Sequence, residues 1–153
     1  MEHLNVSNIK KHSPYRVFVI EDDFEISMII ERVLRSLNVT ISLDWATSAE
    51  TATSQLKYAL SGSSKSPYDL IVADVFLDGE STGIDFWQTC QQLLPETPVL
   101  LTSSLSLDRF FAAIGQSCIS PPFLQKPFSP RECRQVFETM LKYSRKEARH
   151  NFI

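Results

Sequence analysis

Short runs of aliphatic and β-branched residues alternate with longer segments of helical period from Tyr15 onward. The runs predict five strands, over residues 15–20, 39–44, 68–73, 98–102 and 122–125. Because the runs are almost continuously apolar, we expect the strands to be buried on both faces, as in a parallel sheet. Their regular alternation with helices is typical of βαβ units.

Five helices are predicted between and after the strands, over residues 24–37, 47–60, 83–94, 107–114 and 129–143. The first has the clearest apolar stripe, formed by Ile26, Ile29, Ile30, Val33, Leu34 and Leu37. Pro95 and Gly115 mark helix ends, and Ser129 followed by Pro130 and Glu132 marks a helix start. Right-handed crossovers place helices on both sides of a parallel sheet, so we expect an α/β sandwich of three layers.

The bulk composition narrows the class of protein. The chain has 153 residues, 43% hydrophobic and 22% charged, with a net charge of −3, so we expect no general attraction to nucleic acid or membrane. One domain over residues 15–143 is predicted, with a polar N-terminal extension at 1–14 and a basic C-terminal tail at 144–153.

Cysteine usage and hydropathy bear on the cellular compartment. Cys90, Cys118 and Cys133 are odd in number and scattered, so we expect reduced thiols and neither a disulfide framework nor a zinc site. No apolar run approaches the ~20 residues of a membrane helix, and the N-terminus lacks the apolar core of a signal peptide. These features predict a cytoplasmic protein.

Polar side chains follow four of the predicted strands. They are Glu21, Asp22 and Asp23 after the first strand, Asp74 after the third, Thr102, Ser103 and Ser104 at the fourth, and Lys126 after the fifth. The carboxyl ends of parallel strands meet at one edge of a sheet, so we expect these groups to converge. Clustered carboxylates repel one another unless a cation neutralises them, and such oxygen ligands suit Mg²⁺ or Mn²⁺.

A weakly ligated Mg²⁺ leaves coordination positions that phosphate oxygens commonly take. A lysine and a hydroxyl on the neighbouring strands would suit the remaining phosphate oxygens. The pattern therefore predicts phosphoryl transfer, with Asp74 as the nucleophile that accepts the group.

Residues 15 to about 143 resemble the response-regulator receiver domain of bacterial two-component signalling. The resemblance rests on the order and spacing of four motifs: VFVIEDD, DLIVADVFLDG, PVLLTSS and FLQKPF. It implies a flavodoxin-like fold with the sheet order 2-1-3-4-5. It also implies roles for the site residues. Asp74 would be the phosphoacceptor, and Lys126 and Ser103 would bind phosphate. The metal would be held by Asp22, Asp74, Glu21 and the Phe76 backbone carbonyl, and the switch would be formed by Ser103 and Phe123. Pro127 commonly follows a cis bond in this family.

Three acids compete for the two metal-binding positions after the first strand, and helix phase separates them. The family spacing counted from Asp22 reaches only apolar residues of the helix that follows, whereas counting from Asp23 reaches Glu31 and Arg35. Glu21 and Asp22 are therefore assigned to the pair, and Asp23 to the start of the helix. A similar count from Pro98 selects Ser103 over Thr102.

The sequence departs from the family pattern in two places. Asp78 stands where proline is usual, in a loop, DGESTG, that is one residue longer than expected, so Asp78 and Glu80 would affect phosphate approach or hydrolysis. Residues 116–122 replace the usual short turn before the fifth strand.

The resemblance implies a histidine kinase or phosphotransfer protein as phosphoryl donor. It implies a downstream protein target, or a homodimer formed on phosphorylation, at the face of the fourth helix, fifth strand and fifth helix, with Phe110 or Phe111, Phe123 and Val136 as apolar candidates. Such a domain assists its own phosphorylation and dephosphorylation and is not an enzyme for a separate substrate.

Two rival interpretations remain open. One is a haloacid-dehalogenase-like phosphatase, which normally has a second aspartate two residues after the nucleophile, where this chain has Phe76. The other is a pseudo-receiver that binds a partner without being phosphorylated.

Overall fold

The computed structural model describes residues 13–63, 65–115 and 120–150. Most of the predicted N-terminal extension, Cys118 and the last three residues of the predicted tail lie outside them. Strands and helices alternate in the order β1 (Tyr15–Ile20), α1 (Phe24–Arg35), β2 (Ile41–Ala46), α2 (Ala49–Leu60), β3 (Leu70–Asp74), α3 (Gly83–Leu93), β4 (Val99–Ser103), α4 (Leu107–Ile114), β5 (Phe123–Gln125) and α5 (Pro130–His150).

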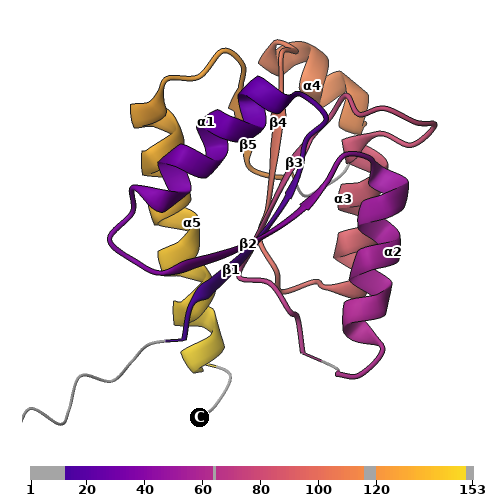
Figure 1. Ribbon diagram of the computed structural model, residues 1–153. Coiled ribbons are helices and arrows are strands. Elements are labelled where there is room, and N and C mark those ends of the chain that lie inside the picture. The colour runs from indigo at the N-terminus through magenta and orange to yellow at the C-terminus, as the bar shows by residue number, and fades with distance from the viewer. Residues whose placement is uncertain (1–12, 64, 116–119, 151–153) are drawn as a thin grey trace, which may run out of the picture.

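All five strands are parallel and follow the order β2-β1-β3-β4-β5, as predicted. Figure 1 shows the sheet between two helical layers, with α1 and α5 on one side and α2 and α3 on the other. The α/β three-layer sandwich predicted from the sequence is therefore confirmed. Because every strand runs the same way, the carboxyl ends of β1, β3, β4 and β5 lie along one edge.

The apolar core has two halves, one on each face of the sheet. Successive residues of β1 point to opposite faces of the sheet. Val17 and Val19 therefore face α1 and α5, whereas Phe18 and Ile20 face the layer of α2, α3 and α4. Both halves are closed by large side chains with almost no exposed surface, such as Phe137 and Phe86. This alternation also decides the face on which each residue beyond a strand end emerges.

The observed β2 is displaced from its prediction. It spans Ile41–Ala46 instead of residues 39–44, because Ile41 pairs with Tyr15 and Val39, 42% exposed, belongs to the turn after α1. The other strands shift by at most two residues at either end.

Helix α5 continues to His150, so the predicted end at residue 143 is wrong. The extension carries no apolar stripe and is held by polar contacts to the start of the sheet. The Arg145 guanidinium lies 3.6 Å from the centre of the Tyr15 ring and 3.9 Å from the Asp69 carboxylate. Long charged side chains that pack on rings are not recognised by an apolar pattern. The division into a domain and a tail stays a prediction.

Among the described residues, no helix combines the length and the apolar character needed to cross a bilayer.

Gly83 is the first residue of α3 and brings that helix onto the end of β3. A Cβ added there would overlap the Asp74 carbonyl oxygen and crowd the Val75 backbone. We therefore predict that Gly83→Ala lowers the free energy of unfolding by roughly 2–4 kcal/mol, because backbone has to move. The control is Gly62→Ala, where an added Cβ meets open space. Urea unfolding of both variants checks this, and equal midpoints would contradict it.

Candidate functional site

Lys126 lies at the centre of the candidate site. It follows β5 by one residue and shares the sheet face of Leu124, as Glu21 shares that of Val19 and Asp74 that of Val72. Its ammonium Nζ lies 2.9 Å from Glu21 Oε2 and 2.9 Å from Asp74 Oδ2. The bond to Pro127 is cis, as the family resemblance implies.

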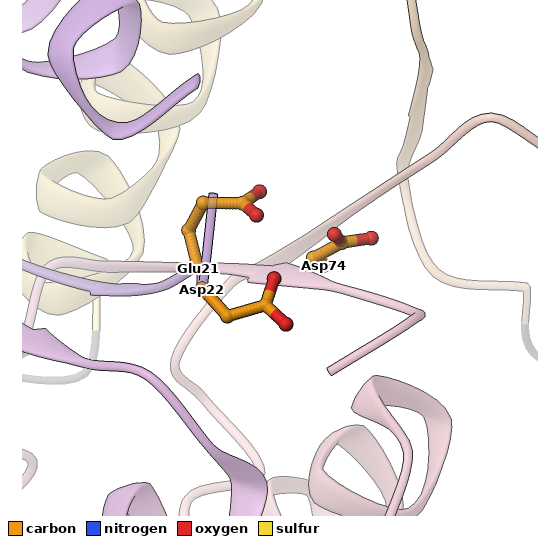
Figure 2. Close-up of side chains that lie close together, drawn as sticks. All are labelled: Glu21, Asp22 and Asp74. Carbon is orange, nitrogen blue, oxygen red and sulfur yellow. The ribbon is translucent and has the colours of Figure 1, made fainter. Parts of the chain in front are cut away.

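A third carboxylate completes an acidic cluster. Ligand oxygens of Glu21, Asp22 and Asp74 all lie within 4.8 Å of one another. Figure 2 shows the three carboxylates pointing into the same space, two from the end of β1 and one from the end of β3. The structure thus brings together four of the predicted site residues: these acids and Lys126.

The structure separates Asp22, which lies in the acidic cluster, from Asp23. Asp23 caps α1, accepting hydrogen bonds from the backbone N–H groups of Glu25 and Ile26, and its side chain is not part of the cluster. The apolar residues reached by counting from Asp22 are buried, as the helix phase predicts, except Ile29, which is 37% exposed.

Asp74 itself is almost fully buried. Its Oδ2 accepts the Lys126 hydrogen bond and its Oδ1 accepts one from the Phe76 N–H at 3.1 Å. The Phe76 side chain is 53% exposed. Both carboxylate oxygens are therefore oriented, and the role of the Phe76 carbonyl stays a prediction.

One ammonium faces three carboxylates in the described part of this site. Burial raises the pKa of Glu21 to about 7, although its hydrogen bond with Lys126 opposes the shift. Burial alone would lower the pKa of Lys126, but hydrogen bonds to Glu21 and Asp74 outweigh it and raise the pKa. Lys126 is therefore held charged, and the most buried acid tends to keep its proton.

The donor set fits a divalent cation. Hard carboxylate oxygens from two strands converge, and their charge exceeds that of the single lysine. Mg²⁺ and Mn²⁺ favour such oxygen ligands. Glu21, Asp22 and Asp74 are the side chains that would hold the ion.

Two hydroxyls lie at the end of β4, on opposite faces of the sheet. Ser103 is fully buried, and its Oγ accepts a hydrogen bond from the Leu105 N–H at 3.2 Å. Thr102 pairs in register with Asp74, is 1% exposed, and its Oγ1 has no hydrogen-bond partner among the described residues. The predicted role of Ser103 in phosphate binding stays a prediction.

The proposed switch residue, Phe123, is half-buried and stacks on Phe110 of α4, with ring centres 4.1 Å apart and planes at 15°. Phe110 has no exposed surface, so it is not available to a partner. Phe111, 48% exposed, is the outward residue of the pair.

The long loop after β3 contains contacts that the sequence did not reveal. The Asp78 N–H donates to Asp22 Oδ2 at 3.1 Å, and the N–H groups of Glu80 and Ser81 donate to Glu50 Oε1 at 3.0 and 2.8 Å. Asp78 and Glu80 were considered for their charges, yet their backbones make these contacts. Glu50 was missed, and its sequence signal is weak: it is an acid two residues after Ser48, the cap of α2.

The fold and the acidic cluster define an α/β protein with a carboxylate site at the carboxyl edge of a parallel sheet. The sequence matches the model of the response regulator receiver domain over residues 17–138. The chain belongs to this family. A search of curated protein sequences found no significant match.

Solved structures with the same fold are numerous, and three illustrate the range. A signal receiver domain of an HD domain-containing protein from Pseudomonas fluorescens Pf-5 is 20% identical, with a TM-score of 0.71, covering 95% of this chain and 98% of its own. A CheY-like receiver domain protein from Methanospirillum hungatei JF-1 is 18% identical, with a TM-score of 0.68 and coverages of 88% and 99%. The phosphorylated cyanobacterial phytochrome response regulator RcpA is 17% identical, with a TM-score of 0.67 and coverages of 86% and 94%.

The raised pKa of Glu21 predicts a pH-dependent stability in the absence of divalent ions. The folded protein binds this proton more tightly than the unfolded chain, so stability is lost as the pH rises from about 4.5 to about 7. Glutamine is neutral at every pH, so we expect Glu21→Gln to be more stable than the parent at pH 8, by up to about 3 kcal/mol. Below pH 4.5 we expect no such gain, because Glu21 is then protonated in both the folded and the unfolded parent. Urea unfolding across pH in EDTA measures this, with Glu96→Gln as an exposed control. If the free energy of unfolding depends on pH in the same way for the parent and for Glu21→Gln, the raised pKa of Glu21 is ruled out.

The unpartnered Thr102 hydroxyl predicts a stabilising substitution. Thr102→Val removes a buried polar group and conserves the shape, so we expect a gain of about 1 kcal/mol. Ser103→Ala is the matched comparison and should lose about 1 kcal/mol, because its hydroxyl has a partner. Thermal unfolding distinguishes the two, and a loss of stability in Thr102→Val would show that this hydroxyl has an unrecognised role.

Proposed function

We propose that the protein is a receiver that accepts a phosphoryl group on Asp74 from a phosphohistidine of a kinase or phosphotransfer protein, in the cytoplasm. The observation that carries this proposal is the Asp74 carboxylate, paired with Lys126 at 2.9 Å and clustered with Glu21 and Asp22. Neighbours of the same fold that were determined phosphorylated, as in RcpA, or activated with BeF3, as in the DrrB receiver domain, support it.

In the proposed reaction an Asp74 carboxylate oxygen forms a bond to phosphorus while the phosphorus–nitrogen bond of the donor breaks. The electron pair of that bond returns to the imidazole. The hydrogen bond from the Phe76 N–H orients the nucleophile, and Lys126 remains charged to bind a phosphoryl oxygen. Ser103 supplies a hydroxyl donor to the phosphorylated form.

Mg²⁺ or Mn²⁺ would be held by Glu21, Asp22, Asp74 and the Phe76 carbonyl, and would offset the negative charge that gathers as a phosphate approaches three carboxylates. The same residues remain in place for hydrolysis, so the domain would assist its own dephosphorylation and would not act on a separate substrate.

Exposed apolar side chains lie on elements that adjoin the acidic cluster. Phe24 at the start of α1 is 76% exposed, and Phe76 after β3 is 53% exposed. A partner that carries the phosphohistidine would bury them as it approaches Asp74. Phosphorylation would then draw Ser103 toward the phosphate, move Phe123, and change the face of α4, β5 and α5 for a downstream protein or a second copy.

The phosphatase alternative is less favoured. Its second aspartate would stand at Phe76, and no acidic side chain replaces it there. A pseudo-receiver is also less favoured, because Lys126 is bonded to both Glu21 and Asp74 in the arrangement that phosphoryl binding needs.

The proposal predicts that a small phosphodonor such as acetyl phosphate, with Mg²⁺, labels Asp74. Asp74→Asn should abolish the label, because an amide is a poor nucleophile. Mass spectrometry of the modified peptide and lability of the phosphate to base and hydroxylamine measure this. The control is Asp78→Asn, which changes an exposed aspartate in the loop after β3 and should still be labelled.

Labelling that persists in Asp74→Asn would disprove the assignment. Sustained hydrolysis of p-nitrophenyl phosphate by the parent would favour the phosphatase. A stable parent that binds no phosphoryl group from any donor would favour the pseudo-receiver.

A further inference from the structure

The loop between β3 and α3 is fastened to the rest of the molecule at both ends. At its start the Val75 N–H donates to the Thr102 carbonyl, and at its end the Gly83 N–H donates to the Val75 carbonyl, both at 2.9 Å. Between these points lie residues 76–82, which are mostly exposed, although Leu77 packs against the core. The exposed residues 78–81 are held by polar contacts.

One of those contacts reaches the acidic cluster directly. The Asp78 N–H donates to Asp22 Oδ2, and the Asp78 backbone also forms a parallel bridge with Ser48. Asp22 is the least buried acid of the cluster, so fewer protein contacts restrict its carboxylate. The Asp78 N–H is thus a group that sets where the Asp22 oxygens point.

The next two amides of the loop are held by Glu50, which comes from the first turn of α2. A single oxygen, Glu50 Oε1, accepts from the Glu80 N–H at 3.0 Å and the Ser81 N–H at 2.8 Å. These are charge-assisted bonds, which are stronger than bonds between neutral groups. The Ser81 N–H in particular keeps the pKa of Glu50 below its usual value, so the side chain stays ionised.

Gly79 makes this approach possible. Its φ of 104° lies in the region that residues with a side chain avoid, and an added Cβ would lie 2.7 Å from Glu50 Oε2. The loop backbone and the Glu50 carboxylate are therefore in direct contact, and Gly79 lies between Asp78 on one side and Glu80 on the other.

We propose that Glu50 is a positioning residue for the phosphoacceptor site. By holding Glu80 and Ser81 it fixes the loop in the conformation in which the Asp78 N–H orients Asp22. Glu50 touches neither Asp74 nor a phosphate. It acts on divalent-ion affinity and on the rate of phosphorylation through the loop. This inference rests on the proposed function.

Three variants test it. Glu50→Ala removes both hydrogen bonds, whereas Glu50→Gln can keep them through its amide oxygen and loses only the charge. Gly79→Ala disturbs the same contact from the loop side. The matched controls are Glu96→Ala, an exposed glutamate before β4, and Gly115→Ala, which has φ of 73° but open space around an added Cβ.

We expect Glu50→Ala and Gly79→Ala to weaken Mg²⁺ binding about three- to tenfold in calorimetric titration and to slow labelling of Asp74 similarly. The Mg²⁺ affinity and labelling rate of Glu50→Gln should be closer to those of the parent. The two control variants should have parental values. Hydrogen exchange of residues 78–81 should be faster in Glu50→Ala, without a large change in global unfolding. A variant that combines Glu50→Ala with Gly79→Ala should bind Mg²⁺ no more weakly than the more affected single variant, because both substitutions act on one contact.

The possible failures are distinguishable. If Glu50→Ala speeds exchange of the loop amides but leaves Mg²⁺ affinity and labelling at parental values, Glu50 is only structural and the inference is wrong. If loop exchange does not change, the contact does not hold the loop, and the inference is also wrong. If the parent binds no Mg²⁺ and accepts no phosphoryl group, the proposed function fails and the inference fails with it.

Discussion

The Lys126 ammonium, bonded at once to Glu21 and Asp74, is the interaction on which the candidate site depends. Lys126 lies 105 positions from Glu21 and 52 from Asp74 in the chain, so the contact forms only when the ends of β1, β3 and β5 are brought together in the sheet. One ammonium is insufficient for three carboxylates. The folded chain therefore carries an excess of negative charge at one edge, and the proposed divalent ion would offset it.

Much of the fold follows from local patterns that the sequence states clearly. Apolar runs predicted all five strands, and their parallel order came from the family resemblance. Helix phase separated Asp22 from Asp23, because a helix that must bury one stripe fixes the direction of the residues before it. Four of the site residues could be predicted to meet, since parallel strands end at the same edge.

Other features depend on contacts that no local pattern encodes. The start of β2 is set by its pairing with Tyr15 and not by Val39, although Val39 favours a strand. The extension of α5 is held by Arg145 on Tyr15 and Asp69, a polar contact between the two ends of the described chain. Glu50 accepts hydrogen bonds from the backbone of a loop about 30 residues away. Because the donors are backbone N–H groups, the side chains of Glu80 and Ser81 do not indicate this contact.

The stacked rings of Phe110 and Phe123 have a consequence for how this end of the sheet can rearrange. With ring centres 4.1 Å apart and Phe110 wholly enclosed, a movement of Phe123 alone would expose part of Phe110 to water at a cost in free energy. A joint displacement of helix α4 and strand β5 keeps the two rings stacked, so it is favoured over a displacement of either element by itself.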